Sequence, residues 1–135
     1  MTGPLVVTAP PAVDPPHDCV LCPRLSGHIA AWRTKEPDWH NGPVPTWLPP
    51  QGENAVRLLI VGLAPGARGA NRTGRPFTGD ASGEALFAGL DRHGLARGHR
   101  PGSAGEGVDL IGTAITNAVH CVPPENRPVA AEINA

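Results

Sequence analysis

The sequence has almost no net charge, and it lacks a long hydrophobic run. Lysine and arginine number 11 against 12 aspartates and glutamates, which leaves a formal net charge of −1 at pH 7. A uniformly basic nucleic-acid-binding protein is therefore excluded, although an enzyme that acts on nucleic acid needs only a local basic patch. No apolar stretch is long enough to span a membrane, and the N-terminus lacks the pattern of a signal peptide. We expect a cytoplasmic protein with no membrane partner.

Cysteine is also scarce, with three residues, and an odd number fits poorly with a closed disulfide framework. Cys19 and Cys22 form a C-x-x-C pair, which suits a zinc ion or an iron–sulfur cluster, and Cys121 lies far downstream. Both kinds of site normally take four ligands. A histidine as the fourth ligand would favour zinc, and the candidates are His17, His28 and His120. Alternatively, the fourth ligand is a cysteine beyond residue 135, or the C-x-x-C pair is redox-active or incidental.

Glycine and proline, at 17 residues each, supply about a quarter of the chain. The hydrophobic share of 40% and the low net charge nevertheless argue against disorder throughout. Residues 1–16 contain five prolines and little periodicity, so we expect a disordered or extended arm there. Residues 17–135 are expected to form the folded part.

Hydrophobic patterning predicts an α/β protein. The continuous apolar run Val56–Val61 has the length of a strand and predicts a strand buried on both faces of a parallel sheet. A second strand is expected within residues 108–119. A helix is expected between the two strands, around residues 85–90, with Asp80 or Ser82 as its N-cap.

Other segments are expected to flank this βαβ unit. Helical spacing of apolar residues predicts a short helix over residues 25–33. Residues 37–52 are expected to form a loop and residues 94–107 a linker or mobile loop, because both are rich in glycine or proline. A further helix is expected to start within residues 125–135.

Residues 62–80, directly after the first predicted strand, carry the densest group of chemically useful residues. Their glycines let backbone amides approach a ligand closely. Phe77 offers a flat stacking face and Asp80 a carboxylate. Three arginines can contact phosphates, namely Arg68, Arg72 and Arg75. This combination is typical of a site for a planar base on a charged backbone, whereas a P-loop is disfavoured because the Gly-Lys-Ser/Thr ending is absent.

Each of these residues also has an ordinary structural interpretation. Phe77 could belong to the core, Asp80 could serve only as a helix cap, and Asn117 could be a turn residue at a strand end. The arginines could form a solvated surface. Each structural interpretation is strong for one residue taken alone. It is weakened because the other candidate residues occur in register with it along the chain.

Three segments together resemble the iron–sulfur uracil-DNA glycosylases, most of all the family 5 or type b branch. They are Cys19–Leu25, Gly62–Asp80 and Thr116–Arg127, which occur in the order of that family. The resemblance implies a three-layer α/β/α fold with a central parallel sheet, of which this chain holds the N-terminal part. It also implies excision of uracil and other deaminated bases from DNA, by hydrolysis of the N-glycosidic bond after base flipping.

The resemblance implies a role for each matching residue. Asp80 matches the proposed catalytic acid, Phe77 the aromatic that stacks on the flipped base, and Asn117 the residue that reads the pyrimidine edge. The first active-site motif adds three base-binding residues, Gly62, Leu63 and Ala64. The two arginines predicted to grip flanking phosphates are Arg72 and Arg75.

The resemblance further implies that Cys19, Cys22 and Cys121 are three of the four ligands of a [4Fe–4S] cluster. The family carries its fourth cysteine soon after the position of Glu132, followed by a later histidine-bearing motif, and neither is present in this chain. We therefore expect a C-terminally truncated, monomeric protein whose partner is DNA containing uracil or deaminated bases. A non-catalytic iron–sulfur or zinc-binding fragment is the alternative.

Overall fold

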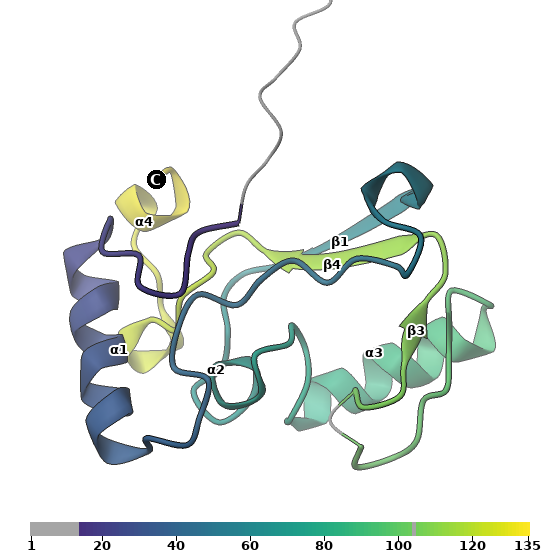
Figure 1. The fold of residues 1–135 in the computed structure, drawn as a ribbon, viewed down its shortest axis with the longest axis horizontal. Coiled ribbons are helices and arrows are strands. Elements are labelled where there is room, and N and C mark those ends of the chain that lie inside the picture. Colours follow the sequence, from purple (N-terminus) through teal and green to yellow (C-terminus); the bar gives the residue numbers. More distant parts are fainter. Residues whose placement is uncertain (1–13, 104) are drawn as a thin grey trace, which may run out of the picture.

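The computed structural model describes residues 14–103 and 105–135, whose arrangement is shown in Figure 1. Most of the expected N-terminal arm, residues 1–13, lies outside the described residues. In chain order the helices and strands are α1 (Pro23–Lys35), η1 (Glu53–Ala55), β1 (Leu58–Gly62), α2 (Ala70–Thr73), α3 (Ala81–Arg92), β2 (Ala96–Arg97), β3 (Asp109–Leu110), β4 (Thr113–Asn117), η2 (Pro124–Asn126) and α4 (Ala130–Ile133).

The two predicted strands pair in parallel, as expected. β1 and β4 run in a register from Leu58 opposite Thr113 to Gly62 opposite Asn117, so both strands end at the same edge of the sheet. β2 and β3 form a separate antiparallel pair. α1 and α4 lie at one end of the molecule and α3 with β3 at the other (Figure 1). The expected α/β class with a parallel sheet is confirmed.

The prediction that the first strand is buried on both faces is wrong for this chain. Leu59 and Val61 are 54% and 57% exposed, whereas β4 is buried along most of its length. The reason is the number of neighbours. β4 lies between β1 and Trp47, which bridges to Ile115, while β1 pairs with β4 alone among the described residues. The apolar composition of β1 is that of a central strand, but its position is that of an edge strand.

The second predicted strand, over residues 108–119, is divided. Gly112 has a φ of +58° between β3 and β4, a left-handed conformation that suits glycine and turns the chain from one sheet to the other. The segment 94–107, expected as a linker or mobile loop, contains β2, which pairs with β3. Two-residue strands carry too little periodicity to be recognised from sequence.

α1 extends the predicted helix by two residues at each end. Leu25 and Ile29 are 2% and 3% exposed, as their spacing predicted. Trp32 is partly buried and stacks on Trp39, with ring centroids 5.2 Å apart. Residues 37–52 form the expected loop without a helix or strand. None of the helices in the described part of the chain has the length and apolarity to cross a membrane.

α3 covers the core between the two sheets. Its buried residues Phe87 and Leu90 pack on one apolar cluster with four residues of the strands and their approaches, Ala96, Val108, Leu110 and Ile115. Because Ile115 belongs to β4 and Leu110 to β3, this cluster joins both sheets to the helix.

Gly89 lies inside α3 at a position that would accept a side chain. A Cβ atom built there would meet no atom within 4 Å outside the local helix backbone. Gly89→Ala is therefore expected to raise the free energy of unfolding by about 0.5–1 kcal/mol, because glycine loses more backbone freedom on folding than alanine. Urea denaturation followed by tryptophan fluorescence measures the change. Gly83→Ala, in the same helix, should instead destabilise, because its Cβ would collide with the carbonyl oxygen of Phe77.

α4 is attached to α1 by an ion pair between Arg24 and Glu132. Nη2 of Arg24 lies 2.8 Å from Oε1 of Glu132, and Nε donates to Oε2 at 3.1 Å. These hydrogen bonds hold the pKa of Glu132 below its ordinary value, against the opposing effect of burial. The stabilisation is therefore present above the unfolded-state pKa of about 4.3 and is lost as the pH falls through the lower folded-state pKa.

Glu132→Gln is accordingly expected to lower the free energy of unfolding at pH 7 by about 1.5–3 kcal/mol, the range for a hydrogen bond to a charged group. Urea denaturation at a series of pH values should show the difference in unfolding free energy from the wild type shrinking below about pH 4. The carboxylate of Glu132 is progressively protonated there and then carries no charge, as glutamine carries none. A difference that stays constant down to pH 2 would contradict the role of the charge.

Candidate functional site

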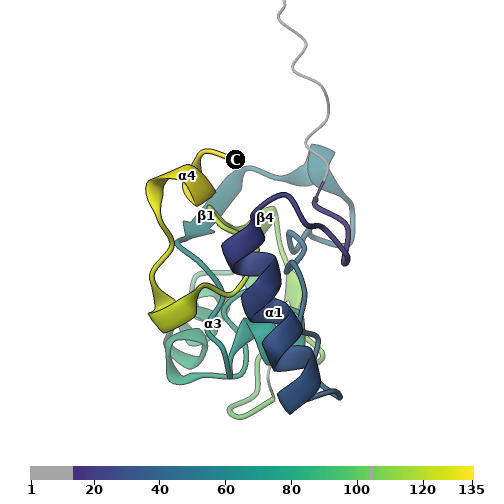
Figure 2. The ribbon, with the colours of Figure 1, turned by 90° about the vertical axis from the view of Figure 1, so that its left-hand side faces the viewer.

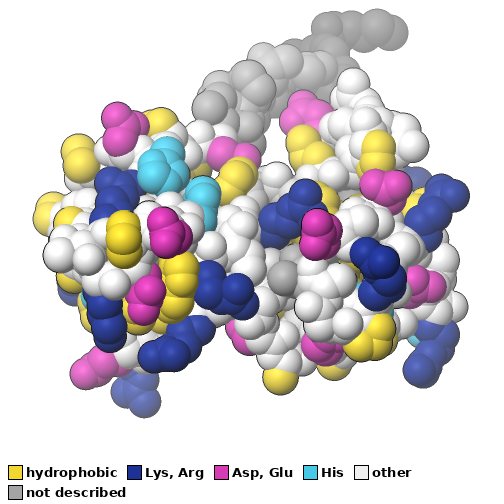
Figure 3. Space-filling model, turned by 60° about the horizontal axis from the view of Figure 1, so that its bottom comes forward, with side chains coloured by type: hydrophobic (Ala, Val, Ile, Leu, Met, Phe, Trp, Pro, Cys, Tyr) yellow, Lys and Arg dark blue, Asp and Glu magenta, His cyan; other side chains and the backbone are white. Residues whose placement is uncertain are grey.

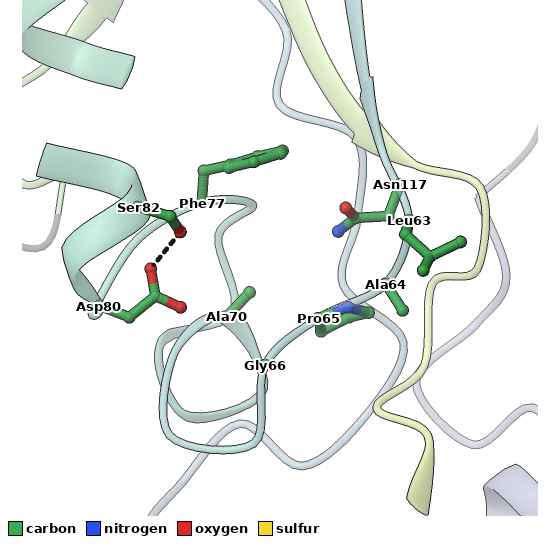
Figure 4. A pocket seen from close by; sticks show the side chains of 9 residues that line it. All are labelled: Leu63, Ala64, Pro65, Gly66, Ala70, Phe77, Asp80, Ser82 and Asn117. Atoms are coloured by element: carbon green, nitrogen blue, oxygen red, sulfur yellow. Dashed lines mark hydrogen bonds between the residues drawn. The ribbon is translucent and has the colours of Figure 1, made fainter. Parts of the chain in front are cut away.

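A pocket of about 110 Å³ lies where the parallel strands β1 and β4 end. Ligands of α/β sheets are commonly bound outside the carboxyl ends of parallel strands. Its volume is below the roughly 300–1,000 Å³ of sites for drug-sized ligands, so it suits one ring rather than a whole nucleotide. The lining residues, shown in Figure 4, are Leu63, Ala64, Pro65, Gly66, Ala70, Phe77, Asp80, Ser82 and Asn117.

Gly62, Phe77 and Asn117 meet at one side of this pocket. Gly62 pairs with Asn117 in the sheet, and a Cβ atom built on Gly62 would lie 2.6 Å from Cζ of Phe77 and also against Oδ1 of Asn117. Asn117 is only 6% exposed. Its amide points into the pocket toward Phe77 (Figure 4) and forms no side-chain hydrogen bond with any described residue. The pocket therefore contains an amide that has no side-chain hydrogen bond to a described residue and lies beside an aromatic ring.

Phe77 is held in an unusual backbone conformation. Its φ of +57° is left-handed, which is rare for a bulky residue and is often found at functional sites. Gly83, in the first turn of α3, lies so close to the carbonyl oxygen of Phe77 that any Cβ at Gly83 would collide with it. Phe77 also packs against the core cluster, so its structural and its predicted binding role coexist. The contact between Gly83 and Phe77 has no signal in the sequence.

Asp80 serves as the N-cap of α3, and it also faces the pocket. Its Oδ1 accepts hydrogen bonds from Oγ of Ser82 at 2.8 Å and from the backbone N–H of Gly83 at 3.4 Å. Its other oxygen, Oδ2, lies over the loop 63–69 between β1 and α2, here called the glycine loop. This oxygen is 2.5 Å from a Cβ atom built on Gly69 and 3.3 Å from one built on Gly66. The two oxygens are thus divided between the helix cap and the pocket. Asp80 is the one carboxylate among the lining residues.

The glycine loop is fixed from behind by a buried pair of asparagines. Nδ2 of Asn71 donates to Oδ1 of Asn41 at 3.0 Å, and the backbone N–H of Asn71 donates to the carbonyl of Gly66 at 3.1 Å. Both asparagines are almost fully buried. Sequence reasoning missed this pair, because its two members lie 30 residues apart and carry no motif.

Leu63 and Ala64, two of the residues predicted to bind the base, line the pocket, and both are apolar. Neither side chain can position a water molecule by a hydrogen bond. Among the lining side chains, the groups able to bind water are therefore Asp80, Ser82 and Asn117.

The structure separates the two arginines that were predicted to contact DNA. Nη2 of Arg72 donates to the carbonyl of Gly79 at 3.2 Å, and Arg72 lines a hollow that adjoins the pocket at Asp80. The guanidinium of Arg75 lies 5.0 Å from the ring centroid of Trp47 and donates to the carbonyl of Gly105. Arg72 therefore lies beside the pocket, whereas Arg75 packs away from it. Their contact with DNA stays a prediction.

Cys19, Cys22 and Cys121 line a second cavity, of about 340 Å³, near the N-terminal end of α1. Burial raises the pKa of the Cys121 thiol to about 11, and the neighbouring Cys19 and Cys22 thiols add to the effect. The three thiols are thus close enough to influence one another electrostatically. Of the three histidines considered as a fourth ligand, His120 is the one that lines this cavity.

The donor set, three thiols around one cavity, fits an iron–sulfur cluster. Within residues 14–103 and 105–135, no group of three cysteine, histidine or acidic side chains converges on a point where one metal ion would bind. The cysteines of an iron–sulfur cluster each bind a different iron, so they surround a cavity instead of meeting at a point. Three thiols around one cavity fit this requirement, with three donors supplied by the described residues.

The sequence has clear relatives. Residues 49–135 match the family model of the Uracil DNA glycosylase superfamily. The chain is 44% identical over 128 residues to the Type-5 uracil-DNA glycosylase of Thermus thermophilus. The matched region covers 87% of this chain and 53% of that protein. The chain is 42% identical over 120 residues to the Type-5 uracil-DNA glycosylase of Pyrobaculum aerophilum, covering 86% and 51%. A Type-4 uracil-DNA glycosylase of the same organism is 40% identical over 89 residues, covering 65% and 38%.

Fold and pocket together define an α/β protein with a ring-sized site at the ends of its parallel strands. The chain belongs to the uracil DNA glycosylase superfamily, and its sequence is similar to that of Type-5 members over most of its length. The resemblance noted in the sequence is thereby confirmed. The chain spans about half the length of the Type-5 relatives that it matches.

Proposed function

We propose that this chain forms the base-binding side of a DNA repair glycosylase, which hydrolyses the N-glycosidic bond of uracil and other deaminated bases. The proposal is supported chiefly by the meeting of Phe77, Asp80 and Asn117 in one ring-sized pocket. A base inside a duplex is inaccessible, so the nucleotide must rotate out of the stack before it enters the pocket. The names of the relatives support uracil as the base.

Recognition would come from the ring and the amide. Stacking of a base on Phe77 would contribute about 1–3 kcal/mol and would offset part of the cost of unstacking. The amide of Asn117 offers one acceptor and one NH₂ donor group, which can pair with N3–H and O4 of uracil. Cytosine presents the opposite pattern, so a fixed amide would discriminate against it. Because the Asn117 side chain has no other hydrogen-bond partner among the described residues, the wrong base would cover its amide and leave it unsatisfied.

Bond cleavage would be assisted at both ends of the broken bond. Positive charge develops on the sugar, where Oδ2 of Asp80 would stabilise it or orient the attacking water. Negative charge develops on the leaving base, where backbone N–H groups of the glycine loop would stabilise it by donating hydrogen bonds. The amides of Ala64 and Gly66 are suited to this role, because neither donates to a backbone carbonyl of a described residue.

We propose that Cys19, Cys22 and Cys121 hold a [4Fe–4S] cluster, with a fourth ligand from outside this chain. Bound there, the cluster would supply cross-links between the start of α1 and the segment after β4. The three cysteines would contribute thiolates, and the half-buried position of Cys121 would limit access of water and oxidants to the site.

DNA carrying uracil or deaminated bases is the proposed partner, with the protein acting as a cytoplasmic monomer. On the face shown in Figure 3, lysine and arginine side chains are interspersed with acidic ones instead of forming one continuous basic surface. This distribution supports local contacts to a few phosphates, with Arg72 beside the pocket as the first candidate.

A second candidate function is a non-catalytic cluster-binding or zinc-binding fragment. It is favoured because the cysteine cavity and the pocket share no lining residue, and because the chain matches about half the length of the Type-5 relatives. Absorbance distinguishes the metals, because an iron–sulfur protein is brown and a zinc protein is colourless. Activity distinguishes the two functions.

The test uses a uracil-containing oligonucleotide that is treated with alkali after incubation, so that base loss appears as strand scission. It is applied to the 135-residue chain and to the same chain fused to the C-terminal half of the Thermus thermophilus relative. We expect scission at uracil by the fusion, with a thymine-containing oligonucleotide as the uncut control. A brown, folded fusion that cuts neither oligonucleotide would contradict the proposal and favour the non-catalytic alternative.

A further inference from the structure

The cavity lined by the three cysteines has a third wall that carries no cysteine. Cys19 and Cys22 precede α1 and Cys121 follows β4, whereas Glu132 and Ala135 line the cavity from the segment 127–135. Figure 2 shows α4, which belongs to this segment, beside the N-terminal end of α1. Access to the thiols therefore depends on how firmly the segment 127–135 is held.

Arg24 supplies the polar contacts that attach this segment to α1. Its guanidinium forms a two-bond fork with Glu132, and Nη2 also donates to the carbonyl of Arg127 at 2.8 Å. Apolar packing contributes little, because Val129 and Ile133 are 48% and 42% exposed. One side chain thus holds the segment at two points, one before α4 and one within it.

Among the residues that the structure describes, Arg24 is the one cationic partner of Glu132. The residue is only 8% exposed, and Oε1 also accepts from the backbone N–H of Val129 at 2.9 Å, which closes the first turn of α4. Without Arg24 a buried carboxylate would be left uncompensated, which is costly. The same carboxylate lines the cavity of the thiols, so it would also face their negative charge once they bind metal.

We propose that Arg24 and Glu132 are positioning residues of the cysteine site, whose ion pair holds the segment 127–135 as a wall of the cavity and thereby sets how long a cluster stays bound. The inference rests on the cluster proposed above, and it adds two residues that are not cluster ligands. Arg24 combines two effects: its fork orients the wall, and its positive charge compensates the carboxylate next to the thiols.

Hydrogen exchange of the metal-free chain tests the attachment directly. Arg24→Gln is expected to raise the exchange rate of amides within residues 130–134 by tenfold or more. Arg24→Lys should give a smaller increase, because lysine keeps the charge but cannot form the fork. Arg97→Gln is the matched control and should leave exchange unchanged, since Arg97 is exposed on β2 and its side chain has no hydrogen bond or ion pair to a described residue.

Cluster lifetime tests the consequence. After anaerobic loading of the fusion described above with iron and sulfide, the visible absorbance of its Arg24→Gln and Glu132→Gln variants should decay several-fold faster in air than that of the wild-type fusion. The reversed pair, Arg24→Glu with Glu132→Arg, should recover part of the lifetime. Unchanged exchange in Arg24→Gln would overturn the proposal, as would faster exchange with an unaltered lifetime. A wild-type fusion that takes up no iron would also overturn it, while the glycosylase proposal would still be decided by the oligonucleotide assay.

Discussion

Replacing Asp80 by asparagine is expected to lower the rate of uracil excision by about 10²–10⁴-fold, the usual contribution of a positioned acid or base. Asparagine keeps an oxygen that can accept from Ser82 and from the N–H of Gly83, and it caps helices as well as aspartate does. The change therefore removes the charge of Oδ2 over the glycine loop and leaves the start of α3 intact. Single-turnover scission of a uracil oligonucleotide by the fusion measures the rate.

Two variants separate the catalytic role of Asp80 from its role as a cap. Ser82→Ala removes one hydrogen bond to Oδ1 and keeps the carboxylate, so excision should fall only slightly. Asp80→Ala removes both functions, so it should lose activity and also destabilise the fold by about 0.5–2 kcal/mol, the cost of losing an N-cap. Equal rates for the wild type and Asp80→Asn would show that the carboxylate is a cap alone.

Gly62→Ala is expected to weaken binding of a uracil-containing oligonucleotide by about 10–100-fold. The added methyl would lie 2.6 Å from Cζ of Phe77 and against Oδ1 of Asn117, so the ring and the amide cannot both keep their positions. Loss of base stacking alone corresponds to about 1–3 kcal/mol, and overpacking would cost a similar amount of stability. Fluorescence anisotropy of a labelled oligonucleotide measures the affinity.

Gly27→Ala provides the matched control for Gly62→Ala. Gly27 lies in α1, and a Cβ atom built on it meets no atom within 4 Å outside the helix backbone. The same chemical change should there leave oligonucleotide binding unaltered. Unchanged affinity in Gly62→Ala would mean that the ring and the amide do not act on the same base, and it would remove the main support for the proposed function.

Local patterns predicted the elements that depend on local interactions. The spacing of Leu25 and Ile29 identified the buried face of α1. The sequence offered Asp80 and Ser82 as candidates for the N-cap of α3, and Asp80 is the cap. The apolar run of β1 identified a strand of a parallel sheet, because such composition is typical of strands covered on both faces. Its exposure in this chain could not be predicted, since it depends on how many strands lie beside it.

The geometry of the pocket was beyond the reach of sequence reasoning. Glycine loop, ring, amide and carboxylate were identified by type and order, and the structure places all four around one cavity. The left-handed backbone of Phe77 and its contact with Gly83 depend on the docking of α3. The packing of Arg75 on Trp47 likewise depends on a contact between distant segments, and it distinguishes two arginines that look equivalent in the sequence.

The left-handed conformation of Phe77 has a consequence for the energetics of recognition. Ordering a side chain on binding usually costs about 0.5–1.5 kcal/mol. Here the close approach of Gly83 constrains the backbone of Phe77, and the ring packs against the core cluster, so the ring is placed when the protein folds, before any nucleic acid arrives. The entropic penalty is thus borne by the stability of the free protein, and an extruded base meets a preorganised surface.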